Sequence, residues 1–167
     1  GNWIEEQYYH TKKLPYFANA WIIGNFKTVS SGNDYWSPLP DPFDPLFVER
    51  ADVTLAKVAQ QVKNSPWCVG VFIDNEKSWG MMNSDTTRYG IVINTLKNNA
   101  KNSPTKAEFV LLMKNKYNKI SKLNKAWNTT LSSWDEFAEG VTLTQFNDHV
   151  NIDLSAMLFH YANQYFA

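Results

Sequence analysis

The sequence predicts an α/β protein whose strands lie parallel in one sheet. Three observations lead to this prediction: a mostly apolar run at 14–24, a helical pattern that begins at Pro45, and a second short apolar run at 67–73. Strand, loop, helix and strand in this order form a βαβ unit, whose two strands are parallel because the helix returns the chain to the starting edge.

The first apolar run, LPYFANAWIIG, is bounded by turn-forming residues, and this pattern predicts a strand that is buried on both faces. It leads into a long polar segment, NFKTVSSGNDYWSPLPDPFDP, which has four prolines between Pro38 and Pro45. Loops of this length inside a compact domain usually have a function. We therefore expect a functional loop here.

Asp44 and Pro45 are typical of an N-cap followed by the first helical residue. Apolar residues then recur at helical spacing, namely Phe47, Ala51, Leu55, Val58, Ala59 and Val62, and Asn64-Ser65-Pro66 ends the helix. The run from Trp67 to Ile73 is short and rich in Val, Phe and Ile, which favours a strand.

The rest of the chain predicts helices. A polar, Asn-rich stretch extends to Asn102, and a helix then starts at Ser103-Pro104 and runs through about Tyr117. Helical spacing continues at Ile120, Leu123 and Trp127, Ser133 and Glu136 form a capping-box pattern, and Leu154, Leu158, Tyr161 and Tyr165 mark a last amphipathic helix. No repeat or low-complexity linker divides the chain, so residues 1–167 are interpreted as one domain.

The composition argues against several classes of function. Sixteen basic and sixteen acidic side chains leave no net charge, which argues against a nucleic-acid or anionic-membrane surface. No run of about 18 apolar residues is present, so we expect no membrane span. The three histidines have no metal-site spacing and the single Cys68 can form no internal disulfide, so we expect neither a metal nor another cofactor.

Aromatic residues make up 15% of the chain, and seven of them are Trp. Many large rings belong to the core, because their burial contributes the most free energy. A surplus of Trp in a neutral chain also suits a sugar-binding cleft, in which the flat ring faces stack on pyranose faces.

The segment WCVGVFIDNEKSWG, residues 67–80, begins as a strand and ends with Asp74-Asn75-Glu76. In parallel α/β folds, the carboxyl ends of the strands face the site where ligands bind. These residues could instead only cap a loop, but Glu is a poor turn residue, unlike Asp or Asn. The following Lys77-Ser78-Trp79-Gly80 adds a charge and an aromatic plane beside them.

An Asn-Glu pair at the end of such a strand has a clear use in glycoside hydrolysis. The Glu can protonate the leaving oxygen and then deprotonate the incoming water, while the Asn amide can hydrogen-bond a sugar 2-hydroxyl. The sequence thus indicates Glu76 and Asn75 as candidate catalytic and sugar-binding residues.

The segment NSPWCVGVFIDNEKSWG resembles the acid/base strand of glycoside hydrolase family 50, the β-agarases. These belong to a clan of retaining (β/α)₈-barrel hydrolases that also contains the family 42 β-galactosidases. GNW at 1–3 resembles the end of that family's second barrel strand, and LPYFANAWIIG resembles its third. FKTVSSGNDYWSPLPDPFDP resembles the following loop, and KYNKISKLNKAWNTTLSSWDEF the insertion after strand four.

The resemblance implies a fragment of a (β/α)₈ TIM barrel, from about the end of strand 2 to the helix after strand 4. Residues 1–167 would then be part of one catalytic domain. Glu76 would be the general acid/base. The substrate-binding residues would be Asn75, Trp79, Trp3, Asn2 and Trp36.

The implied reaction is hydrolysis of the β-1,4-galactosidic bonds of agarose, with retention, to neoagaro-oligosaccharides. The implied setting is bacterial and secreted, periplasmic or cell-surface. Agarose or a related galactan is the expected partner.

The nucleophile of a retaining mechanism has no candidate in this chain and is expected beyond residue 167. The acidic residues after Glu76 do not end an apolar, strand-like run; they are Asp85, Glu108, Asp135, Glu136, Glu139, Asp148 and Asp153. The chain alone is therefore expected to be inactive. Two alternatives stay open: a related retaining β-galactosidase or galactanase, and a non-catalytic galactan-binding barrel.

Overall fold

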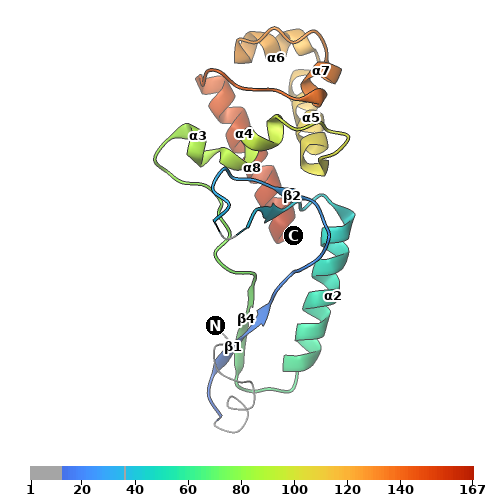
Figure 1. The fold of residues 1–167 in the computed structure, drawn as a ribbon, viewed down its shortest axis with the longest axis vertical. Coiled ribbons are helices and arrows are strands. Elements are labelled where there is room, and N and C mark those ends of the chain that lie inside the picture. The colour runs from blue at the N-terminus through green and yellow to red at the C-terminus, as the bar shows by residue number, and fades with distance from the viewer. Residues whose placement is uncertain (1–12, 36) are drawn as a thin grey trace. The chain divides into compact units, whose positions relative to one another are not determined.

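The computed structural model describes residues 13–35 and 37–167, which divide into two compact units. The first unit holds the described residues before Phe26 together with Pro45–Lys77, and the second holds Phe26–Asp44 and Ser78–Ala167. Each unit is therefore built from two separate stretches of the chain (Figure 1).

The first unit is a βαβ arrangement. Strand β1 (Tyr16–Ala20) pairs in parallel with strand β4 (Cys68–Ile73), and helix α2 (Pro45–Val62) lies between them in the chain and packs against β1 (Figure 1). The buried residues between helix and strands are Tyr16, Ala18, Ala20 and Val58. This confirms the predicted order of elements and the parallel pairing.

The predicted burial of the first strand on both faces is wrong for this chain. The strand covers only five residues and burial alternates along it, so that Phe17 is 45% exposed. Strand β4 is more exposed than β1: none of its residues is buried, and the consecutive Val71, Phe72 and Ile73 are all exposed. The reason is that the described sheet has two strands and one covering helix, which together bury a single face.

The second unit is mainly helical. Its helices are α3 (Asp85–Arg88), α4 (Gly90–Leu96), α5 (Pro104–Tyr117), α6 (Ile120–Trp127), α7 (Trp134–Glu139) and α8 (Asp148–Phe166). Two short strands, β2 (Thr28–Val29) and β3 (Leu39–Pro40), pair antiparallel within the long polar segment. The core of this unit includes Leu39, Ile91, Leu96, Phe109, Met113, Trp127, Phe137, Leu154 and Tyr161, each no more than 2% exposed.

The polar, Asn-rich stretch, for which the sequence predicted no helix, contains the most buried helix of this unit. All of α4 except Asn94 is buried. The prediction failed because Ile91, Val92 and Ile93 are β-branched and favour strands, whereas contacts with α5 and α8 decide their conformation. Packing has overridden local preference here.

Polar groups connect three of the helices. The buried carboxylate of Asp153 on α8 accepts from Lys116 Nζ at 2.5 Å, from Tyr117 Oη at 2.7 Å and from Trp127 Nε1 at 2.7 Å. Each donor comes from α5 or α6. A buried carboxylate is stable only when such partners replace its water.

The predicted capping box at Ser133 is half confirmed. Ser133 Oγ accepts from Glu136 N at 3.2 Å, as an N-cap does. The Glu136 carboxylate, however, accepts from the N–H and hydroxyl of Ser132 at 2.6 and 2.7 Å, one residue before the cap. These bonds lower the pKa of Glu136.

Candidate functional site

The carboxyl ends of β1 and β4 are held together by Asp74. Its N–H donates to Ala20 O at 2.9 Å, and its Oδ1 accepts from Ile22 N at 3.1 Å. The side chain is 8% exposed. Asp74 therefore joins the two strand ends, while Asn75 and Glu76 follow it directly.

Asn75 and Glu76 are both exposed, and the backbone on either side of Asn75 is unusual. Asp74 has φ 55° and Glu76 has φ 48°. Residues other than glycine seldom adopt this left-handed region, at a cost of about 1–3 kcal/mol, and such strain is common at active sites. The strain coincides with the residue that the sequence indicates as the acid/base.

Trp79 lies in the second unit and is partly buried against aromatic residues of α8. Its ring stacks on Phe166 with centroids 5.5 Å apart, and meets Tyr165 and Tyr161 edge-on at 5.2 and 5.8 Å. It also lines a hollow of 450 Å³, together with Gly80, Met81, Met82, Arg88, Tyr89, Ser155 and Leu158. Its substrate-binding role stays a prediction.

Three of the predicted substrate-binding residues cannot be placed. Asn2, Trp3 and Trp36 lie outside the residues that the structure describes. Their roles therefore remain predictions.

Part of the long polar segment has a structural task that the sequence analysis missed. Asp41 is 1% exposed, and its carboxylate accepts from Thr105 N at 3.1 Å and Thr105 Oγ1 at 2.7 Å. Tyr161 Oη donates to Pro40 O at 2.6 Å. Burial raises the pKa of Asp41 above its usual range. These contacts tie the segment to the start of α5 and to α8.

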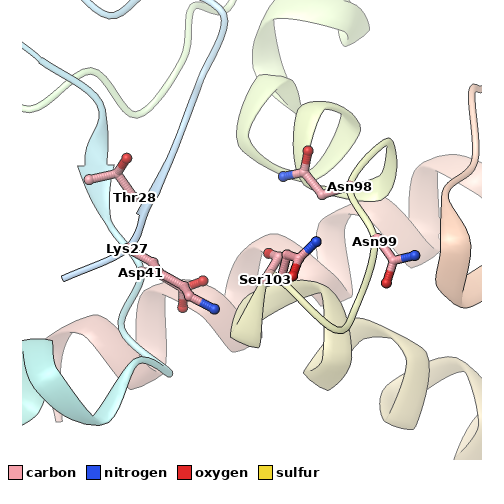
Figure 2. Close-up of a pocket in the computed structure, with 7 residues that line it drawn as sticks. Lys27, Thr28, Asp41, Asn98, Asn99 and Ser103 are labelled. Carbon is pink, nitrogen blue, oxygen red and sulfur yellow. The ribbon is translucent and has the colours of Figure 1, made fainter.

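A polar hollow of 310 Å³ lies beside the contacts between Asp41 and the start of α5, and the sequence analysis did not predict it. It is lined by Lys27, Thr28, Asp41, Asn98, Asn99, Asn102 and Ser103. Figure 2 shows Lys27 and Thr28 on one side and Asn98 and Asn99 on the other, with Ser103 at the start of α5. None of the predicted site residues lines it, and the Asn-rich composition of 94–102 was its one sequence signal.

A buried lysine was also missed. Lys106 is 0% exposed, its Nζ donates to Leu96 O at 2.9 Å, and the same nitrogen lies 4.3 Å from the centre of the Phe137 ring. Burial lowers the pKa of Lys106 to about 7. The carbonyl at the end of α4 and the ring face thus take the place of a carboxylate partner.

The acidic residues after Glu76 all lie on helices. Asp85 is on α3, Glu108 on α5, Asp135, Glu136 and Glu139 on α7, and Asp148 and Asp153 on α8. No strand follows β4 anywhere in residues 74–167, all of which are described. A second carboxylate at a strand end is therefore absent from this part of the chain.

Neither a metal cluster nor a membrane-crossing helix was found among residues 13–35 and 37–167. No group of three His, Cys, Asp or Glu side chains there could hold a metal ion. No helix in the same ranges combines the length and the apolar character needed to cross a membrane.

Comparison with known proteins gives clear matches over the whole chain. β-Agarase B of Vibrio sp. (strain JT0107) is 41% identical over 169 residues, which cover 100% of this chain and 18% of that protein. A solved structure described as PfGH50B is 57% identical with a TM-score of 0.91, and an exo-β-agarase structure is 50% identical with a TM-score of 0.94. Both matches cover 99% of this chain, but only 24% and 23% of those chains.

No family model matches the chain. The chain covers 18% to 24% of the length of these relatives, which are therefore about four to six times as long. The resemblance drawn from the sequence is nevertheless confirmed: over its whole length, this chain corresponds to one segment of the β-agarases of glycoside hydrolase family 50.

Proposed function

We propose that this chain is the acid/base-bearing segment of a retaining β-agarase. The complete enzyme would hydrolyse the β-1,4-galactosidic bonds of agarose and release neoagaro-oligosaccharides. One observation carries the proposal: the exposed Glu76 directly follows Asn75 at the carboxyl end of β4, in a chain that is 41% identical to a β-agarase over its whole length.

Glu76 would act twice in the reaction. Its protonated carboxyl would donate to the leaving galactosidic oxygen, and the resulting carboxylate would take a proton from the water that resolves the glycosyl-enzyme intermediate. The Asn75 amide would hydrogen-bond the 2-hydroxyl of the sugar, a contact that strengthens in the transition state. The exposure of both side chains leaves them accessible to a polysaccharide.

The second carboxylate would come from another part of the enzyme. A retaining mechanism needs two carboxyl groups about 5–5.5 Å apart. Because all later acidic residues here are on helices, we place the nucleophile beyond residue 167. The isolated chain would then be inactive, since an acid alone cannot form the glycosyl-enzyme intermediate.

The proposed fold is part of a (β/α)₈ barrel, with β1 and β4 as its third and fourth strands. The parallel β1–β4 pair with its crossing helix supports this proposal. So do the exposed apolar side chains of Phe17, Val71 and Phe72, because an apolar strand face in water calls for further covering elements. The second unit would be built from the segments that follow these two strands, where barrel enzymes carry their sites.

Agarose is too large to cross a membrane intact. We therefore place the enzyme outside the cytoplasm: secreted, periplasmic or on the cell surface.

A galactan-binding protein without catalysis is the second candidate. The observation that favours it is that residues 74–167 contain no second carboxylate at a strand end. A Glu at the end of a later strand of the complete protein would support the enzyme, and its absence would support the binder. Product analysis on agarose and on other galactans would separate a β-agarase from a related β-galactosidase.

The decisive experiment substitutes Glu76→Gln in the complete enzyme. Agarose hydrolysis should fall by about 10²–10⁴-fold, the usual contribution of a general acid. The first step on an aryl galactoside with an acidic phenol should fall far less, because that leaving group needs no proton. Glu49→Gln, an exposed carboxyl on α2, is the matched control and should leave both rates unchanged. Retention of more than about a tenth of the agarase activity by Glu76→Gln would contradict the assignment.

A further inference from the structure

The chain on either side of Trp79 is held by hydrogen bonds from other parts of the second unit. Before it, Ser31 Oγ donates to Ser78 Oγ at 3.1 Å. After it, Met81 N donates to Thr87 O at 3.2 Å. Trp79 thus lies between two anchored neighbours.

Ser31 belongs to a tight turn, the Ser30–Asp34 turn, which is locked by its own side chains. The Asp34 carboxylate accepts from Ser30 Oγ at 2.6 Å and from Ser31 N at 3.2 Å. Gly32 N donates to Ser30 Oγ at 2.9 Å, and Gly32 has φ 82°, which glycine adopts freely. These local bonds leave the turn few alternative conformations.

The Ser30–Asp34 turn also packs closely against α4. A Cβ atom at Gly90 would lie 2.0 Å from Ser31 O, so only glycine allows this approach. Ser31 is 5% exposed and α4 is the most buried helix of the unit. The turn is therefore held by close packing against α4. The hydrogen bond from Ser31 to Ser78 in turn restrains the segment that carries Trp79.

We infer that Ser31, acting through Ser78, is a positioning residue for Trp79: the Ser30–Asp34 turn restrains the backbone before Trp79, and with the α8 rings that contact the indole it sets how the indole faces the hollow it shares with Met82, Arg88 and Tyr89. The sugar that stacks on the indole would lie in this hollow. The inference rests on the proposed sugar-binding role of Trp79. An aromatic ring that stacks on a sugar binds it well only when the residues packed behind the ring fix its orientation.

The test measures the affinity of the complete enzyme for an agarose oligosaccharide by calorimetry, in a Glu76→Gln background that blocks hydrolysis. Trp79→Ala should weaken binding about tenfold or more, as loss of a buried aromatic contact does. Ser31→Ala and Ser78→Ala should each weaken it about 3- to 10-fold, the value of one hydrogen bond. Ser78→Thr, which keeps the hydroxyl, should restore affinity.

The double variant Ser31→Ala/Trp79→Ala decides whether Ser31 acts through the ring. It should bind no more weakly than Trp79→Ala alone, because a ring that is absent cannot be misplaced. Ser132→Ala is the matched control: it removes a hydroxyl that bonds Glu136 in the same unit, and it should not change the affinity.

The outcomes separate this inference from the proposed function. If Trp79→Ala weakens binding while Ser31→Ala and Ser78→Ala do not, or if the losses add in the double variant, the positioning role is wrong and the sugar-binding role stands. If Trp79→Ala binds like its parent, the substrate role of Trp79 fails, and the inference fails with it.

Discussion

The two units of this chain differ in how completely they bury their apolar residues. In the described part of the second unit, eighteen apolar side chains form one buried cluster that contains Phe109, Trp127 and Tyr161 at 0% exposure. Among the described residues of the first unit, the buried cluster has four members, and Phe72 and Ile73 on β4 are about half exposed. Helices close a core from nearby segments, whereas a two-stranded parallel sheet needs further strands.

This difference indicates which unit depends on the rest of a longer protein. The second unit meets the usual requirements of a stable domain: a contiguous core, capped helices and a buried carboxylate with three donors. Among its described residues, 13–25 and 45–77, the first unit has no element that covers the second face of the sheet, which fits a piece of a larger sheet. The proposed acid/base Glu76 belongs to the less complete unit.

The largest effect is expected in amide hydrogen exchange of the isolated 167-residue chain. Amides of α4, α5 and α8 should exchange thousands of times more slowly than those of β1 and β4, because opening the closed core costs several kcal/mol and opening the short sheet costs little. Mass spectrometry of peptic fragments would measure this. Equal protection of the β4 and α5 amides would contradict the expected difference in stability between the two units.

A matched pair of Phe substitutions sharpens the same comparison. Phe109→Ala should cost about 3–5 kcal/mol in the isolated chain and in the complete enzyme, because the ring is fully buried. Phe72→Ala should cost less than about 1 kcal/mol in the isolated chain, where the ring is 49% exposed, and about 3 kcal/mol in the complete enzyme if further elements cover it. Urea unfolding of both would measure these values. A small cost for Phe72→Ala in the complete enzyme would contradict the proposed larger sheet.

The smallest effect concerns Lys106 in the closed core. The pKa of Lys106 is about 7 in the folded protein, whereas that of an ordinary lysine is 10.5. Between these two pH values the unfolded chain therefore binds more protons than the folded chain. Stability should therefore rise with pH from about 7 to 10.5, and burial of the charge should cost most below pH 7.

Lys106→Met removes that charge and should stabilise the protein most at pH 6, by roughly 1–2 kcal/mol, with a smaller gain at pH 9.5. Urea unfolding at the two pH values would measure the gain. Lys101→Met, at an exposed position, is the control. It should change the free energy of unfolding by the same amount at both pH values. If Lys106→Met raised the free energy of unfolding by the same amount at both pH values, the pKa of Lys106 would not be lowered in the folded protein.

Local signals in the sequence predicted much of this protein. Pro45 and the apolar spacing after it determine α2, and Ser103-Pro104 determines the start of α5, because caps and periodicity act within a few residues. The Asp74-Asn75-Glu76 triplet could be placed at a strand end for the same reason. These features depend on neighbours along the chain.

Other features were decided only by contacts between residues far apart in the sequence. The run Ile91–Ile93 favours a strand locally, yet it is a buried helix because α5 and α8 pack around it. Asp74 closes the ends of two strands 52 residues apart. Asp41 holds a helix start 64 residues away. No local pattern carries such information, since a carboxylate at a strand end or in a loop has the same sequence signature whether it binds a ligand or a distant backbone N–H. The tertiary structure therefore shows that Asp74 bonds the backbone at the end of β1, while Asn75 and Glu76, the proposed site residues, are exposed beside it.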